Sequence, residues 1–381
     1  DKVYDLTTTY TPGAVLGVQA DGEYTIDTDI ADQLINTTNE VQAVTYYFRY
    51  RLNDPRNGGI PFCDHGVDTS ITMYINPTPR FTVTVADTIV CDSSNILLDV
   101  NDLLGNVYAD KVYDLTTTYT PGAVLGVQAD GEYTINTDIA DQLINTTNEV
   151  QAVTYYFRYR LNDPRNGGIP FCDHGVDTSI TMYINPTPRF TIIVADTVPC
   201  DSTTVIFAVT DLLNQVLGDK VYELTTTFTP GAVIGVSPDG EYTISHNISD
   251  FLVNTTNEFQ VIRYNFRYKL KDNRPGSGYN YCDHGVDTTI FIYLEPTPRV
   301  NWTIVNDTLC DGGEVNYTLL TSSTAVYGIE YNVNVINIYP EITGYSDRTA
   351  LSDIDNPIFE NITNSGDTAR LIKYVLTPFT I

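Results

Sequence analysis

Three copies of a Cys-Asp-His-Gly motif, at 63–66, 172–175 and 282–285, are the residues whose types and spacing could do chemistry. A cysteine beside a histidine could form a thiol nucleophile or a pair of metal ligands. The one histidine outside these motifs is His246, in a single copy, so no second cluster completes a zinc set. The motif therefore favours a structural cystine next to a polar histidine.

Other catalytic patterns are missing from the sequence. There is no G-x-S-x-G elbow for a hydrolase and no glycine-rich phosphate loop before a helix. Carboxylates are so numerous, at 48, that no glycosidase pair stands out from an acidic surface. We expect a protein that is not an enzyme and that has no cofactor.

Calcium is the one ion that the acidic residues could hold. Asp27, Asp29 and Asp32 cluster shortly after Asp21, and oxygen-rich loops of this kind can bind Ca²⁺. No EF-hand loop is present, however, and the second copy replaces Asp27 by Asn136. The sequence predicts at most an occasional calcium site.

The charge of the chain excludes several partners. With 20 basic and 48 acidic residues, the formal net charge is −28. Such a field repels nucleic acid and anionic membranes. No apolar run reaches the roughly 18 residues that a membrane helix needs. We expect no nucleic-acid partner and no membrane span in this segment.

A long repeat organises the sequence. Asp1-Lys2-Val3-Tyr4 recurs from Asp110 and again from Asp219, so the two spacings are equal. Solenoid repeats are much shorter, so each unit is a whole domain. Proline-rich joints recur once per repeat, at Asn76–Pro79, Asn185–Pro188 and Glu295–Pro298.

These joints predict four domains. They are an incomplete repeat at 1–78, complete repeats at 79–187 and 188–297, and an incomplete, divergent repeat at 298–381. The first lacks the opening strands and the last lacks the closing strand. We therefore expect the segment to belong to a longer chain.

Alternating residues predict the fold. In Val44–Leu52, every second residue is apolar or aromatic, which is typical of a half-buried strand. About seven such strands per repeat, separated by Gly, Pro and Asn turns, predict an all-β chain of tandem immunoglobulin-like antiparallel β-sandwich domains arranged end to end. Asp29–Ile35 is interpreted as one or two helical turns. Tyr47 and Tyr74 are predicted to face outward, where they could form a shelf for sugars.

The six cysteines allow two pairing schemes. The preferred scheme pairs cysteines within complete domains, Cys91 with Cys172 and Cys200 with Cys282, and leaves Cys63 and Cys310 to pair outside the segment. The rival joins cysteines across each proline-rich joint: Cys63–Cys91, Cys172–Cys200 and Cys282–Cys310. Extended strands would hold the rival's ends too far apart for a disulfide. The same separation would defeat the preferred pairs if the sandwich places these loops at opposite ends.

The order of motifs resembles a known family. A Pro-x-Pro start is followed by D-T-[ILV]-x-C-D, then by L-x-N-T-T-N, a late cysteine and another N-P-T-P. This order is similar to the PKD-like and Ig-like repeats of giant cell-surface proteins of Bacteroidota, including the SprB-type gliding adhesins.

The resemblance implies a stalk or filament segment of a secreted adhesin, in gliding motility or surface attachment. It implies an extracellular location at the outer membrane of a Gram-negative bacterium. The partners would be neighbouring repeats and, through other regions, an external surface or polysaccharide. The alternative is a glycan-binding module of a secreted carbohydrate-active protein.

The same resemblance implies O-glycosylation at Asp-[Ser/Thr]-aliphatic tripeptides. The candidate acceptors are Thr88, Thr197, Thr308 and Thr368. Asp-Thr is equally a common turn pair whose side chains cap nearby backbone donors. Asn36, Asn145 and Asn254 begin Asn-x-Thr sequons, which would carry sugar in a eukaryotic secreted protein instead.

Overall fold

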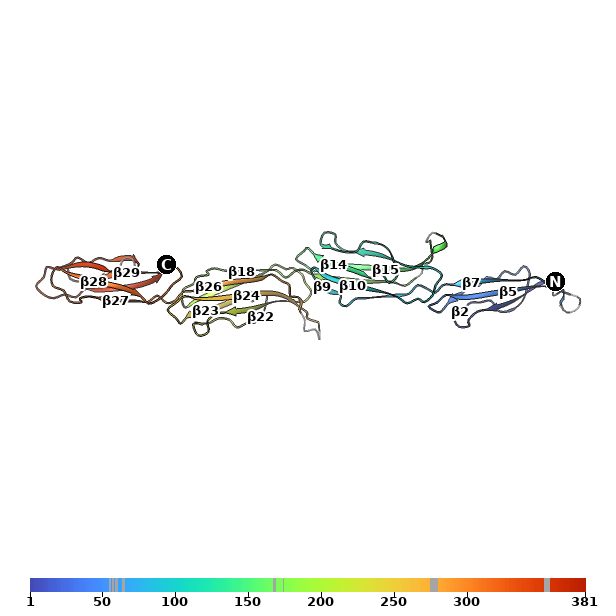
Figure 1. Cartoon of the computed structure of the whole chain (residues 1–381), viewed down its shortest axis with the longest axis horizontal. Coiled ribbons are helices and arrows are strands. Elements are labelled where there is room, and N and C mark those ends of the chain that lie inside the picture. The colour runs from blue at the N-terminus through green and yellow to red at the C-terminus, as the bar shows by residue number, and fades with distance from the viewer. Residues whose placement is uncertain are drawn as a thin grey trace. The chain divides into compact units, whose positions relative to one another are not determined.

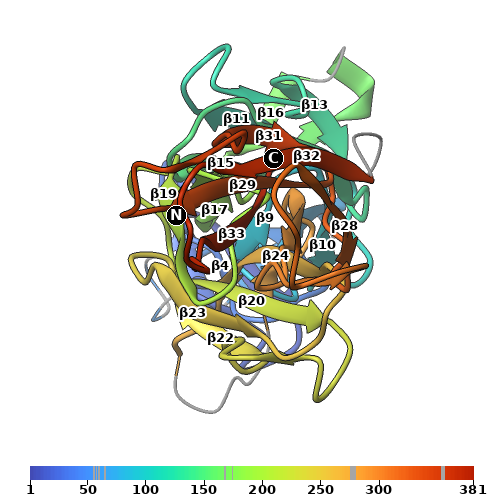
Figure 2. The same ribbon diagram turned by 90° about the vertical axis from the view of Figure 1, so that its left-hand side faces the viewer.

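The computed structural model describes residues 1–54, 56, 58, 61–63, 66–166, 169–173, 175–274, 280–352 and 357–381. Figure 1 and Figure 2 show a ribbon made almost entirely of strands and loops. In the described residues the only helical element is a 3-10 turn, Pro164–Asn166, and no helix is long and apolar enough to cross a membrane. The chain forms two compact units, Asp1–Pro186 and Thr187–Ile381. The finer division into four domains remains a prediction.

Unit 1 begins with one large sheet. Its strand order is β3-β1-β5-β6, with β7 also paired to β5, and a small ladder joins β2 to β4. The strands are β1 (Lys2–Thr9), β2 (Val15–Leu16), β3 (Gly22–Thr25), β4 (Ile35–Asn36), β5 (Gln42–Asn53), β6 (Pro61–Cys63) and β7 (Asp68–Ile75).

A complete two-sheet sandwich follows in unit 1. One sheet has the order β13-β11-β15-β17-β9, with β16 on β15, and the other has the order β12-β14-β10-β8. Its strand pairs are antiparallel except β9 with β17. The strands are β8 (Phe81–Thr84), β9 (Ile89–Cys91), β10 (Ser94–Asp102), β11 (Asp110–Thr118), β12 (Val124–Leu125), β13 (Gly131–Thr134), β14 (Ile139–Asn145), β15 (Gln151–Asp163), β16 (Ile169–Cys172) and β17 (Asp177–Asn185).

Unit 2 repeats this plan twice. Its first sandwich has sheets β22-β20-β24-β25, with β26 on β24, and β18-β19-β23-β21; its second has β27-β28-β32-β30 and β31-β29-β33. The first set of strands is β18 (Phe190–Val194), β19 (Thr203–Asp211), β20 (Asp219–Thr227), β21 (Val233–Ile234), β22 (Gly240–Thr243), β23 (Ile248–Asn254), β24 (Gln260–Lys271), β25 (Asn280–Cys282) and β26 (Asp287–Leu294). The second set is β27 (Val300–Ile304), β28 (Gly313–Thr321), β29 (Ile329–Ile336), β30 (Ile342–Thr343), β31 (Arg348–Leu351), β32 (Ile358–Asn364) and β33 (Lys373–Thr380).

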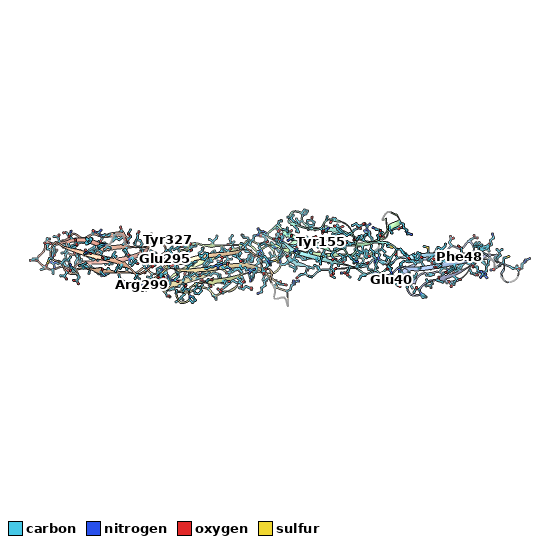
Figure 3. All side chains as sticks on the ribbon, viewed as in Figure 1. Glu40, Phe48, Tyr155, Glu295, Arg299 and Tyr327 are labelled. Atoms are coloured by element: carbon cyan, nitrogen blue, oxygen red, sulfur yellow. The ribbon has the colours of Figure 1, made fainter. Side chains whose placement is uncertain are left out.

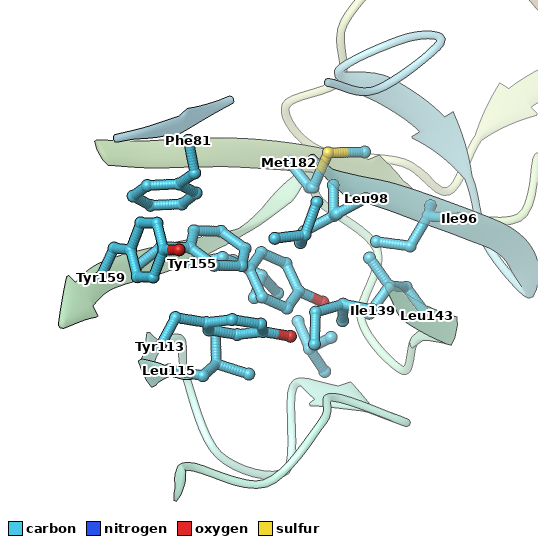
Figure 4. Close-up of a cluster of buried hydrophobic side chains, with 14 of the residues drawn as sticks. Phe81, Ile96, Leu98, Tyr113, Leu115, Ile139, Leu143, Tyr155, Tyr159 and Met182 are labelled. Carbon is cyan, nitrogen blue, oxygen red and sulfur yellow. The ribbon is translucent and has the colours of Figure 1, made fainter. Parts of the chain in front are cut away.

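Alternation along β15 fills the core of the complete sandwich in unit 1. Val153, Tyr155, Phe157, Tyr159 and Leu161 all point inward and are fully buried. Figure 4 shows Tyr155 and Tyr159 packed between the two sheets, against apolar side chains from β8, β10 and β14. The period of two predicted for this strand type is therefore confirmed.

The predicted helical turns at Asp29–Ile35 are wrong. The equivalent residues of the next copy form strand β14, which pairs with β10. Ile139, Asp141, Leu143 and Asn145 are buried alternately along it, so the period is two and not 3.6. In the first copy only Ile35–Asn36 form a strand.

The first sheet of unit 1 has a more exposed face than the equivalent sheet of the next repeat. Met182 on β17 is fully buried, whereas its counterpart Met73 on β7 is 49% exposed. In the second copy the covering side chains come from β8 and β10.

Candidate functional site

Asn36 builds a loop at the end of the first sheet of unit 1, which we name the docking loop (residues 36–41, and 254–259 in unit 2). The buried Asn36 amide donates to the carbonyl oxygens of Glu40 and Ile75, both at 2.8 Å. Its oxygen accepts from the backbone N–H of Thr38 at 2.9 Å. Asn145 and Asn254 make the same contacts in their copies. The asparagine therefore fixes the docking loop to the last strand of its own sandwich.

In unit 1 an ion pair shapes the second loop, which we name the receiving loop (residues 103–108; its counterpart in unit 2 is 322–327). Asp102 accepts from Lys111 Nζ at 2.6 Å, from Tyr159 Oη at 2.9 Å and from the backbone N–H of Leu104 at 2.9 Å. Lys111 also donates to the carbonyl oxygens of Leu104 and Gly105. Every donor of the ammonium group is used, so a charged pair is held half-buried without unmet polar atoms. Burial, with the neighbouring Asp102 carboxylate, raises the pKa of Tyr159 well above its usual value.

The two loops meet inside unit 1. The backbone N–H of Gly105 donates to the carbonyl of Asn39 at 2.8 Å, and Val41 N–H donates to the carbonyl of Asn106 at 2.8 Å. A Cβ atom placed on Gly105 would lie 2.7 Å from Cγ of Glu40, which Figure 3 labels at this joint. The backbones of the docking loop and the receiving loop are thus hydrogen-bonded to one another, as neighbouring strands in a sheet are.

Asn76 adds a side-chain link at the same joint. Its oxygen accepts from the backbone N–H of Tyr108 at 2.9 Å, and its amide donates to the Tyr108 carbonyl at 3.4 Å. The rings of Tyr74 and Tyr108 meet edge to face, with centroids 4.9 Å apart. Asn76 is the first residue of the proline-rich motif, so the motif contributes a contact as well as a turn.

Unit 2 builds the same joint from different residues. Thr324 N–H donates to the carbonyl of Asn257 at 2.7 Å, and Phe259 N–H donates to the Thr324 carbonyl at 2.9 Å. Glu295 replaces the asparagine of the motif, and its carboxylate accepts from Val326 N–H at 3.0 and 3.1 Å. Glu295 and Tyr327 mark this joint in Figure 3. Two backbone hydrogen bonds therefore join the loops at both joints, although the acceptor in the receiving loop differs by one position and the sequences differ.

Glu295 is the one strongly buried carboxylate at either joint within the described residues, with 2% of its surface exposed. Burial raises the pKa of its carboxyl, and the Val326 N–H opposes part of that rise. The joint of unit 2 therefore holds a buried carboxyl group where the joint of unit 1 holds a neutral amide.

Both cysteine pairing schemes are wrong. Cys91 and Cys282 are disulfide-bonded, whereas Cys63, Cys172, Cys200 and Cys310 are free thiols. Neither the preferred pairs Cys91–Cys172 and Cys200–Cys282 nor the rival pairs across the proline-rich joints are formed.

Strand register explains the failure of the preferred pairs. Cys91 lies opposite Asn185, one step beyond the Gln151 end of β15, and Cys172 lies opposite Leu161 near the other end. Roughly eleven residues of strand separate the two levels, which is about 36 Å at about 3.3 Å per residue. A disulfide needs Cα atoms within about 7 Å. Cys200 and Cys282 have the same relation in unit 2.

The Cys-Asp-His-Gly motif shows no catalytic arrangement in the copies that the structure describes. Cys282 is buried and disulfide-bonded, and burial raises the pKa of the Cys172 thiol. His284 is exposed and contacts only Asp283, with Nδ1 2.7 Å from Oδ1. His65 and His174 lie outside the described residues. A thiolate nucleophile is disfavoured in this environment.

Of the predicted calcium ligands, Asp32 is hydrogen-bonded within the fold, and calcium binding stays a prediction. Asp32 accepts from Gln19 N–H at 2.8 Å and from Tyr46 Oη at 2.5 Å. In the second copy, Asn136 and Asp138 accept backbone N–H groups of β10. Across the described ranges, no group of three His, Cys, Asp or Glu side chains could hold a metal ion.

The threonines predicted to carry O-glycans, Thr88, Thr197, Thr308 and Thr368, are all exposed. The turn interpretation also finds support, because Asp87 and Asp196 each accept the backbone N–H two residues on. Modification at these threonines stays a prediction. The sequon asparagines Asn36, Asn145 and Asn254 are buried and fully engaged, so they are not available as sugar acceptors.

The sequence indicated where the joints lie but not how they are made. The proline-rich motif located each joint, and the recurrence of N-T-T-N in three copies could have identified the docking loop. The receiving loop has no recurring motif of this kind, since its sequence changes from Gly105-Asn106 in unit 1 to Thr324-Ala325 in unit 2. Backbone atoms carry the contact there, so side-chain identity is little constrained.

Comparison with known proteins finds only distant likenesses. No protein-family model matches the chain, and no curated protein matches it. Among solved structures, the chain is similar to the Escherichia coli adhesin FdeC (13% identity, 76% of this chain and 81% of that chain, TM-score 0.28). It is also similar to the FN1–FN3 domains of chicken CNTN1 (10% identity, 76% and 91%, TM-score 0.26) and to Salmonella enterica SafA pilin with the SafB chaperone (9% identity, 56% and 97%, TM-score 0.21). At these values the likenesses carry no argument about function.

Proposed function

We propose that this chain is a structural stalk segment of a secreted cell-surface adhesin, whose repeats hold other regions of the protein away from the surface. One observation carries the proposal: the same backbone-bonded joint is built twice, in unit 1 and in unit 2, from different residues. A joint that persists through divergence indicates that the connection between repeats is the selected feature.

Three further features support a stalk. Tandem duplication of whole domains at a regular spacing mostly adds length. The disulfide-bonded Cys91 and Cys282 fit an oxidising, extracellular compartment. The high net negative charge keeps a long surface chain soluble. Attachment to the outer membrane and a role in gliding are the finer part of the proposal and come from the family resemblance.

Amide hydrogen exchange on the whole chain tests the stiffness of the joints. The amides of Val41 and Gly105 in unit 1 and of Phe259 and Thr324 in unit 2 should be protected, because each donates across a joint. Exchange at the rate of an unstructured peptide would mean that neighbouring sandwiches swivel freely, and it would remove the basis for a stalk.

Length and location test the biological role. In cells that carry the full protein, replacing residues 79–187 by a second copy of 188–297 should preserve attachment, whereas deleting both should weaken it. Protease added to intact cells should cleave the chain. A swap that abolishes attachment as fully as the deletion would show that a specific surface of the repeat acts, and not its length.

A further inference from the structure

Two exposed tyrosines form an open corner at the joint of unit 1. Tyr74 lies on β7, and Tyr108 lies in the receiving loop. Their rings stand at 85° to one another with centroids 4.9 Å apart. Each tyrosine residue nevertheless remains 59% exposed. Packing against one another thus holds both rings in place and leaves an open face on each.

The corner opens onto a cavity of about 450 Å³, within the range of small-molecule sites. The cavity is lined by Tyr74, Asn76, Tyr108, Ala109, Asp110, Pro164 and Arg165. One of its polar groups, the Asn76 amide, is held in place before any ligand arrives. Asn76 is fixed by the Tyr108 backbone, and Arg165 Nε donates to Asp163 Oδ1 at 3.0 Å. Preorganised polar groups cost little entropy on binding.

We propose that this corner is a subsite for a neutral hexose oligosaccharide. A pyranose ring has an apolar C–H face that can lie on an aromatic ring and a rim of hydroxyl groups that bind amides and carboxylates. Two aromatic rings at right angles can contact two faces of one sugar residue, or two sugar residues of a bent oligosaccharide. The net charge of −28 disfavours an acidic sugar, and Asp163 already neutralises Arg165.

The repeats themselves offer a variant that is compatible with the fold. In the third copy Leu217 stands at the position of Tyr108, and in the fourth Tyr327 stands there. The receiving loop therefore tolerates leucine, and Tyr108→Leu should remove one wall of the corner without disturbing the joint. Tyr156 provides the matched control, because it is a 47% exposed tyrosine in the middle of β15, away from the cavity.

Calorimetric titration of the full chain with dextran, galactan and mannan oligosaccharides tests the subsite, with polygalacturonate oligosaccharides as the acidic comparison. We expect binding to at least one neutral probe, and an affinity at least tenfold lower for Tyr108→Leu and for Tyr74→Ala, which is about 1.4 kcal/mol. Tyr156→Ala should stay within twofold. Hydrogen exchange at Val41 should be unchanged in Tyr108→Leu, which shows that the joint is intact.

Three results would overturn the subsite: no binding of any neutral probe at about 5 mM, binding of polygalacturonate alone, or an equal loss in Tyr156→Ala. The last would place sugar recognition on the open face of the β15 sheet. None of these results bears on the stalk, because the stalk depends on the protection of the joint amides and not on a ligand.

Discussion

Asp102 shows how a single residue sets the geometry of a joint. It accepts hydrogen bonds from Lys111, Tyr159 and the backbone of the receiving loop. Asp211 makes the corresponding contacts inside the first sandwich of unit 2, with Lys220, Tyr268 and the backbone N–H of Leu213. The sequence alone presented these residues as part of a solvated acidic surface. Their pairing is long-range, so no local pattern could reveal it.

Asp102→Ala should destabilise its sandwich by about 2–4 kcal/mol, because it leaves a half-buried ammonium and a buried hydroxyl without their acceptor. Calorimetry of the whole chain should show one transition at a lower temperature. Asp173→Ala removes one partner of the exposed pair with Arg158 and should change stability by about 0.5 kcal/mol or less. An equal loss in both variants would mean that the Asp102 pair has no special role.

Glu295→Gln should stabilise unit 2 at neutral pH. Burial raises the pKa of Glu295 in the folded state, so the folded protein binds this proton more tightly than the unfolded chain does. The carboxyl therefore contributes favourably below its unfolded pKa, and that contribution is lost as the pH rises through the folded pKa. Glutamine keeps an oxygen for Val326 N–H and carries no charge.

The variant and the natural chain should accordingly differ most at about pH 7 and converge near about pH 4, close to the ordinary range of glutamate. Unfolding of unit 2 at the two pH values measures the difference. A stability gain for Glu295→Gln that is the same at both values would show that charge burial is not its cause.

At the scale of elements, strand patterns were predictable and one connection was not. The alternation in Val44–Leu52 gave the inward face of its strand, because burial on one side of a sheet has a period of two. The same period of two runs through Ile139–Asn145. In the equivalent segment Asp29–Ile35, the Asp and Gln residues between apolar positions led to the prediction of helical turns. Pairing with β10, which is distant in sequence, decides that segment.

Amide hydrogen exchange should be slower in β17 than in β7. Both strands have the same sequence over Asp68–Ile75 and Asp177–Ile184, but Met73 is 49% exposed and Met182 is fully buried. Amides of β17 should therefore exchange more slowly by at least tenfold, since opening β17 exposes more apolar surface. Equal protection of the two strands in the 381-residue chain would contradict this expectation.

For the whole molecule, repetition was the strongest prediction from sequence, and the contacts between repeats were the weakest. The recurrence of Asp1-Lys2-Val3-Tyr4 from Asp110 and from Asp219 is visible without any structure. The joints depend on backbone groups of two loops that are distant in sequence, such as the Asn39 carbonyl and the Gly105 N–H, and no side-chain pattern reveals that pairing. The repeat therefore predicted tandem sandwiches. The docking of one sandwich on the next depends on backbone contacts that the sequence does not reveal.

Cysteine chemistry follows from this whole-molecule arrangement. Each complete sandwich places one cysteine near each end of its large sheet, about 36 Å apart at about 3.3 Å per residue, so no disulfide can form within it. Peptide mapping without reductant should find no Cys91–Cys172 and no Cys200–Cys282 link. Alkylation of the native chain should label the exposed Cys63, Cys200 and Cys310 first, and the half-buried Cys172 more slowly because burial raises its thiol pKa. Recovery of either link within a sandwich would contradict the strand register of β15 and β24, because it would require one end of the sheet to fold back onto the other.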